Sequence, residues 1–386
     1  MKHIYLFVFA VVIWSCTAGS KEMVLPEGME GIRISTKDFS KQSLVKLADE
    51  LELIPLKYDT DESLVANYFS MDVSEEYIYI VSYSQIQNKF IQMFDKSGNF
   101  IKTLRDFPQI DLAFDRIVGI SVLSEDSVLI GTNRHMVITD QFLNYLDHKP
   151  HGVAIENVFS RGEYIYAFTN NNVVNFQDES TFFSVLVFDK RLNLVSGFKP
   201  FVVEENMSRR NVFIHGNILP FAEGILYTEY LNDTLYEITP DGGRPRYLID
   251  FGSKKLNRDK YPDELYITTS DVLERGIMHN PITPVRFGSG KLYFKFTYNE
   301  ISYAVFQDFE KERTLILDPE YTLVNGDFIP FPHYYDGEYF YSMIDDEFAE
   351  TLKTLKDVPE NSIVRQLIRH FEKEFNPMLF KFKVSI

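Results

Sequence analysis

The sequence predicts an all-β fold in which one small antiparallel sheet is repeated six times. Aromatic residues make up 15% of the 386-residue chain, with 34 Phe and 23 Tyr, and such residues suit a half-buried pleated surface. A polar or Gly-bearing turn followed by a strand of alternating apolar residues recurs six times, as in SEEYIYIVS and RGEYIYAFT. The third strand position of the successive copies is Tyr79, Leu129, Tyr166, Tyr227, Tyr293 and Tyr341.

Each copy extends to four strands. A second apolar strand follows the first, for example FIQMFDKSG, and an apolar stretch such as IVGISVL precedes the turn. Outer strands are expected at 100–104, 144–147, 194–198, 246–249 and 314–317. A four-stranded sheet cannot bury both of its faces alone, and repeated sheets of this kind are typical of the blades of a β-propeller. The sequence therefore predicts a six-bladed β-propeller of four-stranded antiparallel blades.

The ring is predicted to close through an N-terminal strand. The sixth unit stops at Ile386 after its third strand, whereas LELIPLKY at 51–58 has no strand nearby in sequence to pair with. We expect residues 51–56 to form the outer strand of the last blade, paired with 379–384, because this removes two open sheet edges. Pro55 lacks an N–H group and suits such an exposed edge.

Two insertions are expected to be helical, at 257–279 and at 345–375. In the second, apolar residues fall at helical spacing on both sides of Pro359. Asp345 or Asp346 can cap the first helix of this insertion, and Ser362 can cap the second. We expect their apolar faces to pack on the ring and cover one of its faces, rather than to bind a partner.

The first residues, MKHIYLFVFAVVIWSC, have the organisation of an export signal. Lys2 precedes an apolar stretch, 4–14, that is too short to span a bilayer, and a small residue, Ser15, precedes Cys16. Cys16 is the only cysteine, so it has no disulfide partner in the chain. The quartet 13–16 resembles a bacterial lipobox, in which the cysteine is lipidated; the alternative is an ordinary secretory signal. The predicted organisation is a lipoprotein signal peptide at 1–15, an anchor linker at 16–45 and the propeller domain at 46–386.

Charge and motifs exclude several classes of function. The formal net charge is −17 and no basic run is present, which argues against a nucleic-acid partner. Phosphate-binding loops, HExxH and GxSxG motifs are absent from the sequence. His148 and His151 are close together, but Pro150 lies between them and no third ligand is nearby. The sequence therefore identifies no cofactor, no metal ligands and no catalytic residues.

The candidate binding residues are the polar residues predicted on the innermost strands, because these strands line the central channel of a propeller. The alternative is that they face water or satisfy neighbouring backbone groups. The candidates are Asp72, Ser121, Glu156, Asn157, His215, Asn217, Arg286 and His333.

Four segments carry a resemblance to a known family: LELIPLKYDTDESLV at 51–65, FIQMFDKSGNFIKTL at 90–104, LNDTLYEIT at 231–239 and NPMLFKFKV at 376–384. On these motifs the chain resembles the six-bladed β-propeller lipoproteins of Bacteroidetes, relatives of the NHL and TolB-like propellers. The resemblance implies a lipid-anchored protein of the cell envelope. In such lipoproteins an acidic run after the cysteine favours the outer face, and its absence here favours the periplasmic face.

Two functions agree with this fold, and the family resemblance supplies no activity that decides between them. One is a membrane-anchored binding or scaffold module for a protein, peptide or glycan. The other is a metal-dependent hydrolase, lactonase or lyase whose site collects side chains from several inner strands at the central channel.

Overall fold

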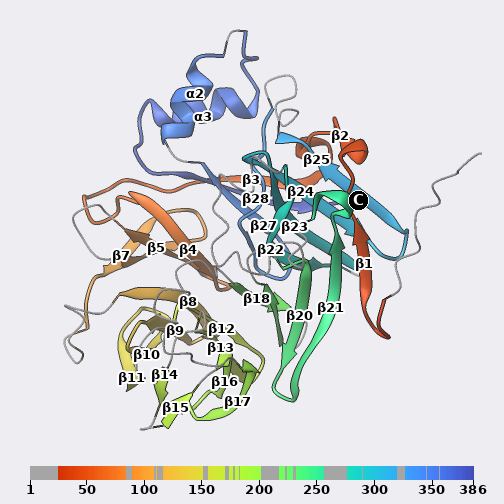
Figure 1. Cartoon of the computed structure of the whole chain (residues 1–386). Helices are drawn as coiled ribbons and strands as arrows, with labels where there is room; N and C mark the ends of the chain where they lie inside the picture. Colours follow the sequence, from red (N-terminus) through yellow and green to blue (C-terminus); the bar gives the residue numbers. More distant parts are fainter. Residues whose placement is uncertain are drawn as a thin grey trace, which may run out of the picture.

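The computed structural model describes residues 25–386 except 84–88, 108–109, 111–115, 151–154, 170–173, 177–178, 182, 201–216, 222–223, 229–231, 256–275, 289, 320–326, 345 and 356. Six four-stranded antiparallel blades form a ring, as the sequence predicts (Figure 1). Figure 1 shows the first strands of the blades nearest the centre and the fourth strands at the periphery.

From the centre outward, the first blade contains β4 (Asn67–Val73), β5 (Tyr77–Tyr83), β6 (Phe90–Asp95) and β7 (Phe100–Leu104). The second blade contains β8 (Ile117–Ser124), β9 (Ser127–Thr132), β10 (His135–Asp140) and β11 (Tyr145–Pro150). The third blade contains β12 (Asn157–Arg161), β13 (Tyr164–Phe168), β16 (Phe183–Asp189) and β17 (Leu194–Pro200). A hairpin of β14 (Val174–Phe176) and β15 (Glu179–Thr181) is inserted in the third blade. The fourth blade contains β18 (Asn217–Phe221), β19 (Gly224–Thr228), β20 (Thr234–Thr239) and β21 (Gly242–Asp250). The fifth blade contains β22 (His279–Phe287), β23 (Lys291–Tyr298), β24 (Ile301–Asp308) and β25 (Arg313–Leu317). The sixth blade contains β26 (Tyr334–Tyr335), β27 (Phe340–Ile344), β28 (Met378–Val384) and β3 (Ala48–Pro55).

The repeated tyrosine position lies in the interfaces between blades. The residues at all six positions are completely buried. The Tyr79 hydroxyl donates to the Gln141 carbonyl of the second blade at 2.8 Å, and the Tyr293 hydroxyl donates to the Pro332 carbonyl before β26 at 3.0 Å. At Tyr79 and Tyr293, the ring therefore fills the apolar interface while the hydroxyl binds the backbone of the next blade.

The predicted closure of the ring is confirmed. Strand β3 pairs antiparallel with β28, with Ile54 opposite Leu379 and Pro55 opposite Met378. The last blade therefore takes its three inner strands from the C-terminal part of the chain and its outer strand from the N-terminal part. This arrangement leaves Pro55 on the outermost strand, where its missing N–H group interrupts no further pairing.

The assignment of 16–45 to an anchor linker is wrong for the part that the structure describes. Strand β1 (Glu30–Arg33) pairs parallel with β21, and β2 (Phe39–Ser40) pairs parallel with β25. Ile32 and Leu44 are buried, which explains why this segment binds to the ring. The fourth and fifth blades therefore gain a fifth strand each, and the folded domain includes residues from β1 onward.

The predicted helical insertion at 345–375 is confirmed as α2 (Asp346–Lys353) and α3 (Ile363–Phe371), with Ser362 capping α3 through a hydrogen bond from the Arg365 amide. Buried Val364 and Leu367 of α3 belong to the same apolar cluster as β28 of the last blade. The insertion expected at 257–279 lies almost entirely outside the described residues; β22 already begins at its end. Among the described residues, no helix has the length and apolar character needed to cross a membrane.

Candidate functional site

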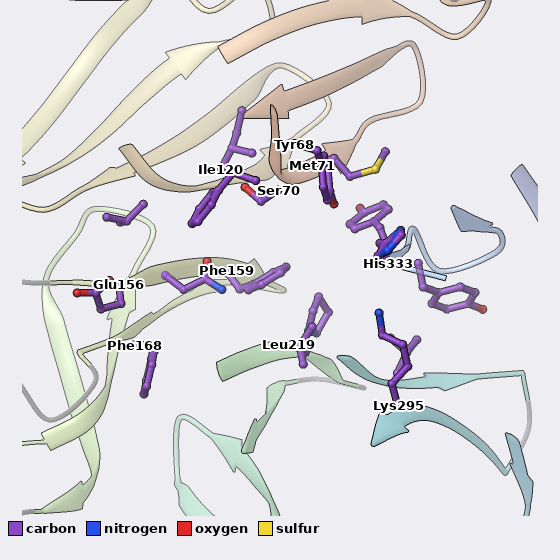
Figure 2. Close-up of a pocket in the computed structure, with 17 residues that line it drawn as sticks. Tyr68, Ser70, Met71, Ile120, Glu156, Phe159, Phe168, Leu219, Lys295 and His333 are labelled. Carbon is purple, nitrogen blue, oxygen red and sulfur yellow. The ribbon is translucent and has the colours of Figure 1, made fainter. Parts of the chain in front are cut away.

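A cavity of about 460 Å³ lies where the innermost strands converge (Figure 2). All six blades contribute to its wall through their inner strands. One lining residue from each, in chain order, is Met71, Ile120, Phe159, Leu219, Val285 and Tyr335. The ring therefore produces a single central site that no blade could form alone.

Strand β4 contributes more side chains to the wall than a regular strand could. Alternation along a strand normally directs only every second side chain to one face. In β4 the register with β5 shifts between Tyr68 and Ser70, which makes Phe69 an extra residue. Such a bulge redirects side chains, and four consecutive residues, 68–71, line the cavity.

The wall of the cavity is mainly aromatic and aliphatic, with a few polar groups. Its aromatic residues are Tyr68, Phe69, Phe159, Phe168, Tyr334 and Tyr335. Its other polar residues are Ser70, Glu156, Asn157, Lys295 and His333. An apolar pocket with a small number of convergent polar groups is the usual form of a ligand-binding site.

Part of the cavity wall carries polar groups for which the described residues provide few partners. The Lys295 amine extends from β23 into the cavity, near His333 (Figure 2). The His333 ring lies 6.1 Å from the Tyr68 ring, centroid to centroid. Ser70 Oγ is buried without a hydrogen-bond partner in the described part of the chain. We call Tyr68, Ser70, Lys295 and His333 the polar cluster.

Burial shifts the protonation of this cluster. The surrounding protein lowers the pKa of Lys295 to about 8. Burial and, to a smaller extent, the Lys295 charge lower the pKa of His333 to about 3. The His333 side chain is exposed where it lines the cavity, but the protein atoms around it disfavour the charged form of its ring and so lower its pKa. At neutral pH the cluster therefore contains one ammonium group and a neutral imidazole.

The opposite side of the cavity contains paired charges. Arg116 Nη2 lies 3.3 Å from Glu156 Oε2, and Lys89 lies over the ring of Phe69. Burial and the charge of Arg116 lower the pKa of Lys89 to about 7, against the opposing effect of Glu156. Asn157 Oδ1 accepts a hydrogen bond from the next backbone amide, Val158, at 2.9 Å.

The structure brings together three of the residues predicted from the sequence: Glu156, Asn157 and His333 line the cavity. Asp72 does not line it. Its carboxylate accepts hydrogen bonds from the Val73 and Val122 amides, at 2.8 and 2.7 Å, and from the Tyr334 hydroxyl, and so joins three inner strands. Burial raises the pKa of Asp72, although these hydrogen bonds act in the opposite direction.

Four other predictions have different outcomes. Ser121 Oγ accepts from the Ser160 amide at 2.9 Å and connects β8 to β12. His215 lies outside the described residues, as does Cys16. Asn217 and Arg286 lie on β18 and β22, but their side chains are outside the described part.

The sequence prediction missed three of the four residues of the polar cluster. Lys295 lies on β23, the second strand of its blade, whereas the predicted residues are those expected on the first strands. Its signal was a lysine within the apolar run KLYFKFTY. Tyr68 and Ser70 face the cavity because of the bulge in β4, which has no evident sequence signal.

The geometry of the described side chains supports no metal site. Among them, no group of three or more His, Cys, Asp and Glu residues could hold a metal ion. Glu156 and His333 both line the cavity, yet neither belongs to such a group.

No family model and no functionally curated protein matches the sequence. The fold, in contrast, has known counterparts. The crystal structure of a protein described as exported, from Bacteroides fragilis, matches with a TM-score of 0.65 and 12% identity, over 93% of this chain and 100% of that chain. The two proteins share a fold. A protein of unknown function from Bacteroides caccae matches with a TM-score of 0.41 and 10% identity, over 69% of this chain and 82% of that chain. BamB from Moraxella catarrhalis matches with a TM-score of 0.37 and 11% identity, over 70% and 68%.

Proposed function

We propose that this protein is a membrane-anchored binding module of the bacterial envelope that holds a peptide segment of a partner protein in its central cavity. The observation that carries this proposal is the cavity itself. All six blades line it, and within the described part of the chain Ser70 Oγ and the Lys295 amine of its polar cluster have no hydrogen-bond partner. Polar groups inside a protein are normally hydrogen-bonded, so a cluster that is left open to a cavity indicates a ligand.

The wall favours a peptide over a glycan. Each sugar ring carries several hydroxyl groups that need hydrogen-bonding partners, whereas polar residues form only the smaller part of this wall. The apolar side chains of a peptide would fill such a cavity, and its few polar groups would meet the polar cluster.

The proposed binding can be tested by blocking the cavity. His333→Trp places a larger ring in the open space near Lys295, and Phe142→Trp places the same ring on an exposed turn of the second blade. A crosslinking pulldown from native membranes should recover a partner with the wild type and with Phe142→Trp, but not with His333→Trp. Recovery of the same partner by all three proteins would move the site away from the cavity. Equal melting temperatures would show that both variants fold.

The anchor is the second part of the proposal, and it rests on the lipobox-like quartet around Cys16. The periplasmic face is favoured because the residues after Cys16, TAGS, are not acidic. Several acyl chains anchor a protein stably, whereas one chain binds only marginally. We expect the wild type to enter the detergent phase and Cys16→Ala to stay in the aqueous phase. A Cys16→Ala protein that still incorporates labelled palmitate would contradict this assignment.

A further inference from the structure

We infer that the ligand of the central cavity presents a carboxylate joined to an apolar group, and that the Lys295 ammonium is the counter-ion of this carboxylate. The inference rests on the proposed function, because it names the chemistry that the same cavity recognises.

The first support is the position of Lys295. Its amine extends from β23 into the cavity (Figure 2) and has no ion pair or hydrogen bond within the described part of the chain. A buried charge normally has a partner of opposite sign. The two carboxylates that the structure describes at or beside the cavity are engaged elsewhere, because Glu156 pairs with Arg116 and Asp72 accepts three hydrogen bonds.

The second support is the set of neutral polar residues that line the cavity together with Lys295. A carboxylate has two oxygens and accepts several hydrogen bonds at once. Tyr68 and Ser70 line the cavity, and neutral His333, which lies near the Lys295 amine (Figure 2), offers one N–H. An ammonium close to a neutral imidazole suits one anionic group of a ligand, and it does not suit a cation.

The third support is the remaining wall, which is apolar. Met71, Ile120 and Leu219 are buried and line the cavity together with Phe159. An apolar group attached to the carboxylate would bury its own surface against this wall, at roughly 25 cal/mol for each Å² buried. Two sources have this chemistry: the C-terminal end of a peptide with an apolar last residue, and a free carboxylic acid.

Three probes separate these sources by titration calorimetry on the full-length protein: acetyl-Gly-Gly-Phe with a free carboxylate, the same peptide as the C-terminal amide, and 3-phenylpropanoate. We expect the carboxylate peptide to bind at least about tenfold more tightly than the amide, which is the usual size of a lost charged hydrogen bond. Tighter binding of the peptide than of 3-phenylpropanoate indicates a peptide end, and the reverse indicates a free acid.

Two variants test the role of Lys295. Lys295→Met removes the charge and keeps most of the volume, and it should weaken both carboxylate probes by about tenfold or more while leaving the amide unchanged. Lys291→Met is the matched control, because it removes the same charge from β23 at a position that does not line the cavity.

The outcomes separate this inference from the proposed function. Equal affinity for carboxylate and amide, or unchanged binding by Lys295→Met, overturns the carboxylate inference. The cavity proposal survives that result if His333→Trp still loses its partner in the pulldown. Failure of the wild type to bind any of the three probes also overturns the carboxylate inference.

Discussion

Asn376 joins the two ends of the chain through three hydrogen bonds. Its buried side-chain amide donates to the carbonyls of Lys57 and Ser63, at 3.0 and 2.8 Å, and accepts from the Val65 amide at 2.9 Å. Residues 57–65 lie between the closing strand β3 and the first blade, and Asn376 lies two residues before β28 begins. One side chain therefore fixes the place where the ring closes.

Asn376→Ala should lower the free energy of unfolding by about 2–4 kcal/mol, because two buried backbone groups and one partly buried carbonyl lose their partner. Urea unfolding followed by circular dichroism measures this change. Asn67→Ala is the control, since that exposed side chain makes one hydrogen bond within the described part of the chain, to the Tyr83 carbonyl. Equal losses in the two variants would contradict the role assigned to Asn376.

The pKa of Lys295 predicts how carboxylate binding depends on pH. The ionisable groups that line the cavity with it are Tyr68, Glu156, His333, Tyr334 and Tyr335. Burial raises the pKa of the three tyrosines and lowers that of His333 to about 3, so these four do not change charge near pH 8. Affinity should therefore be full below pH 8 and fall above it, as the ammonium loses its proton. Calorimetry on either side of pH 8 measures this, and Lys295→Met should abolish the fall.

At the scale of elements, three blades share one turn between their third and fourth strands. In each, an aspartate accepts hydrogen bonds from the backbone two and four residues ahead and from the side chain of the asparagine at the fourth position. The pairs are Asp95 with Asn99, Asp140 with Asn144, and Asp189 with Asn193. The residue before each asparagine has positive φ: Gly98, Leu143 and Leu192.

A lysine from the preceding blade binds each of these turns. Lys57 after β3 binds Asn99, Lys102 of β7 donates to the Phe142 carbonyl at 2.8 Å, and Lys149 of β11 donates to the Leu192 carbonyl at 2.9 Å. Each outer strand is thus connected to the next blade at the periphery of the ring. The tyrosine hydroxyls of β5 and β23 make such connections nearer the centre.

Asp189 should contribute to stability in a pH-dependent way. The backbone amide of Asn193, followed by its side-chain amide, lowers the pKa of Asp189. A carboxyl with a lowered pKa stabilises the fold above its ordinary pKa of about 3.9, and this contribution disappears as the pH falls through the lowered value. Asp189→Asn should therefore unfold at a lower urea concentration than the wild type at neutral pH. The two midpoints should approach each other in acid, and a difference that does not depend on pH would contradict the prediction.

The sequence pattern predicts the six blades but not which side chains line the central cavity. The Tyr-bearing strands and the unpaired segment at 51–58 predicted the ring and its closure. The alternation of apolar residues within a strand and the number of strands do not depend on the lengths of the loops between them. Strands β1 and β2 were missed because they have four and two residues, too few for a periodic pattern. The bulge at Phe69 depends on how β4 pairs with β5, which no local sequence pattern determines.

At the scale of the whole molecule, the N-terminal segment follows the outer edges of three consecutive blades. Strand β1 pairs with the fourth blade, β2 with the fifth and β3 with the sixth, and the chain then enters the first blade (Figure 1). Unpaired edges invite pairing with other chains. The segment therefore completes the last blade and covers the outer edges of the two blades before it.

Truncations from the N-terminus should reveal these contributions one after another. Removal of 1–24 should leave the melting temperature unchanged. Removal of 1–46 should lower it, because β1, β2 and the buried side chains of Ile32, Ile34 and Leu44 are lost. Removal of 1–58 should also expose the edge of β28 and cause aggregation, visible by light scattering. If the last two truncated proteins melt alike, β3 does not close the ring in the manner described.

The order in which the segment meets the blades determines how the protein responds to mechanical load. A force pulling on the chain before β1 first reaches the four residue pairs with β21, then the two pairs with β25, and only afterwards β3. The first two strands can detach without opening any four-stranded blade, because each is an additional fifth strand. A tether at this end would therefore lengthen in steps under tension, while the six inner strands around the cavity keep their positions.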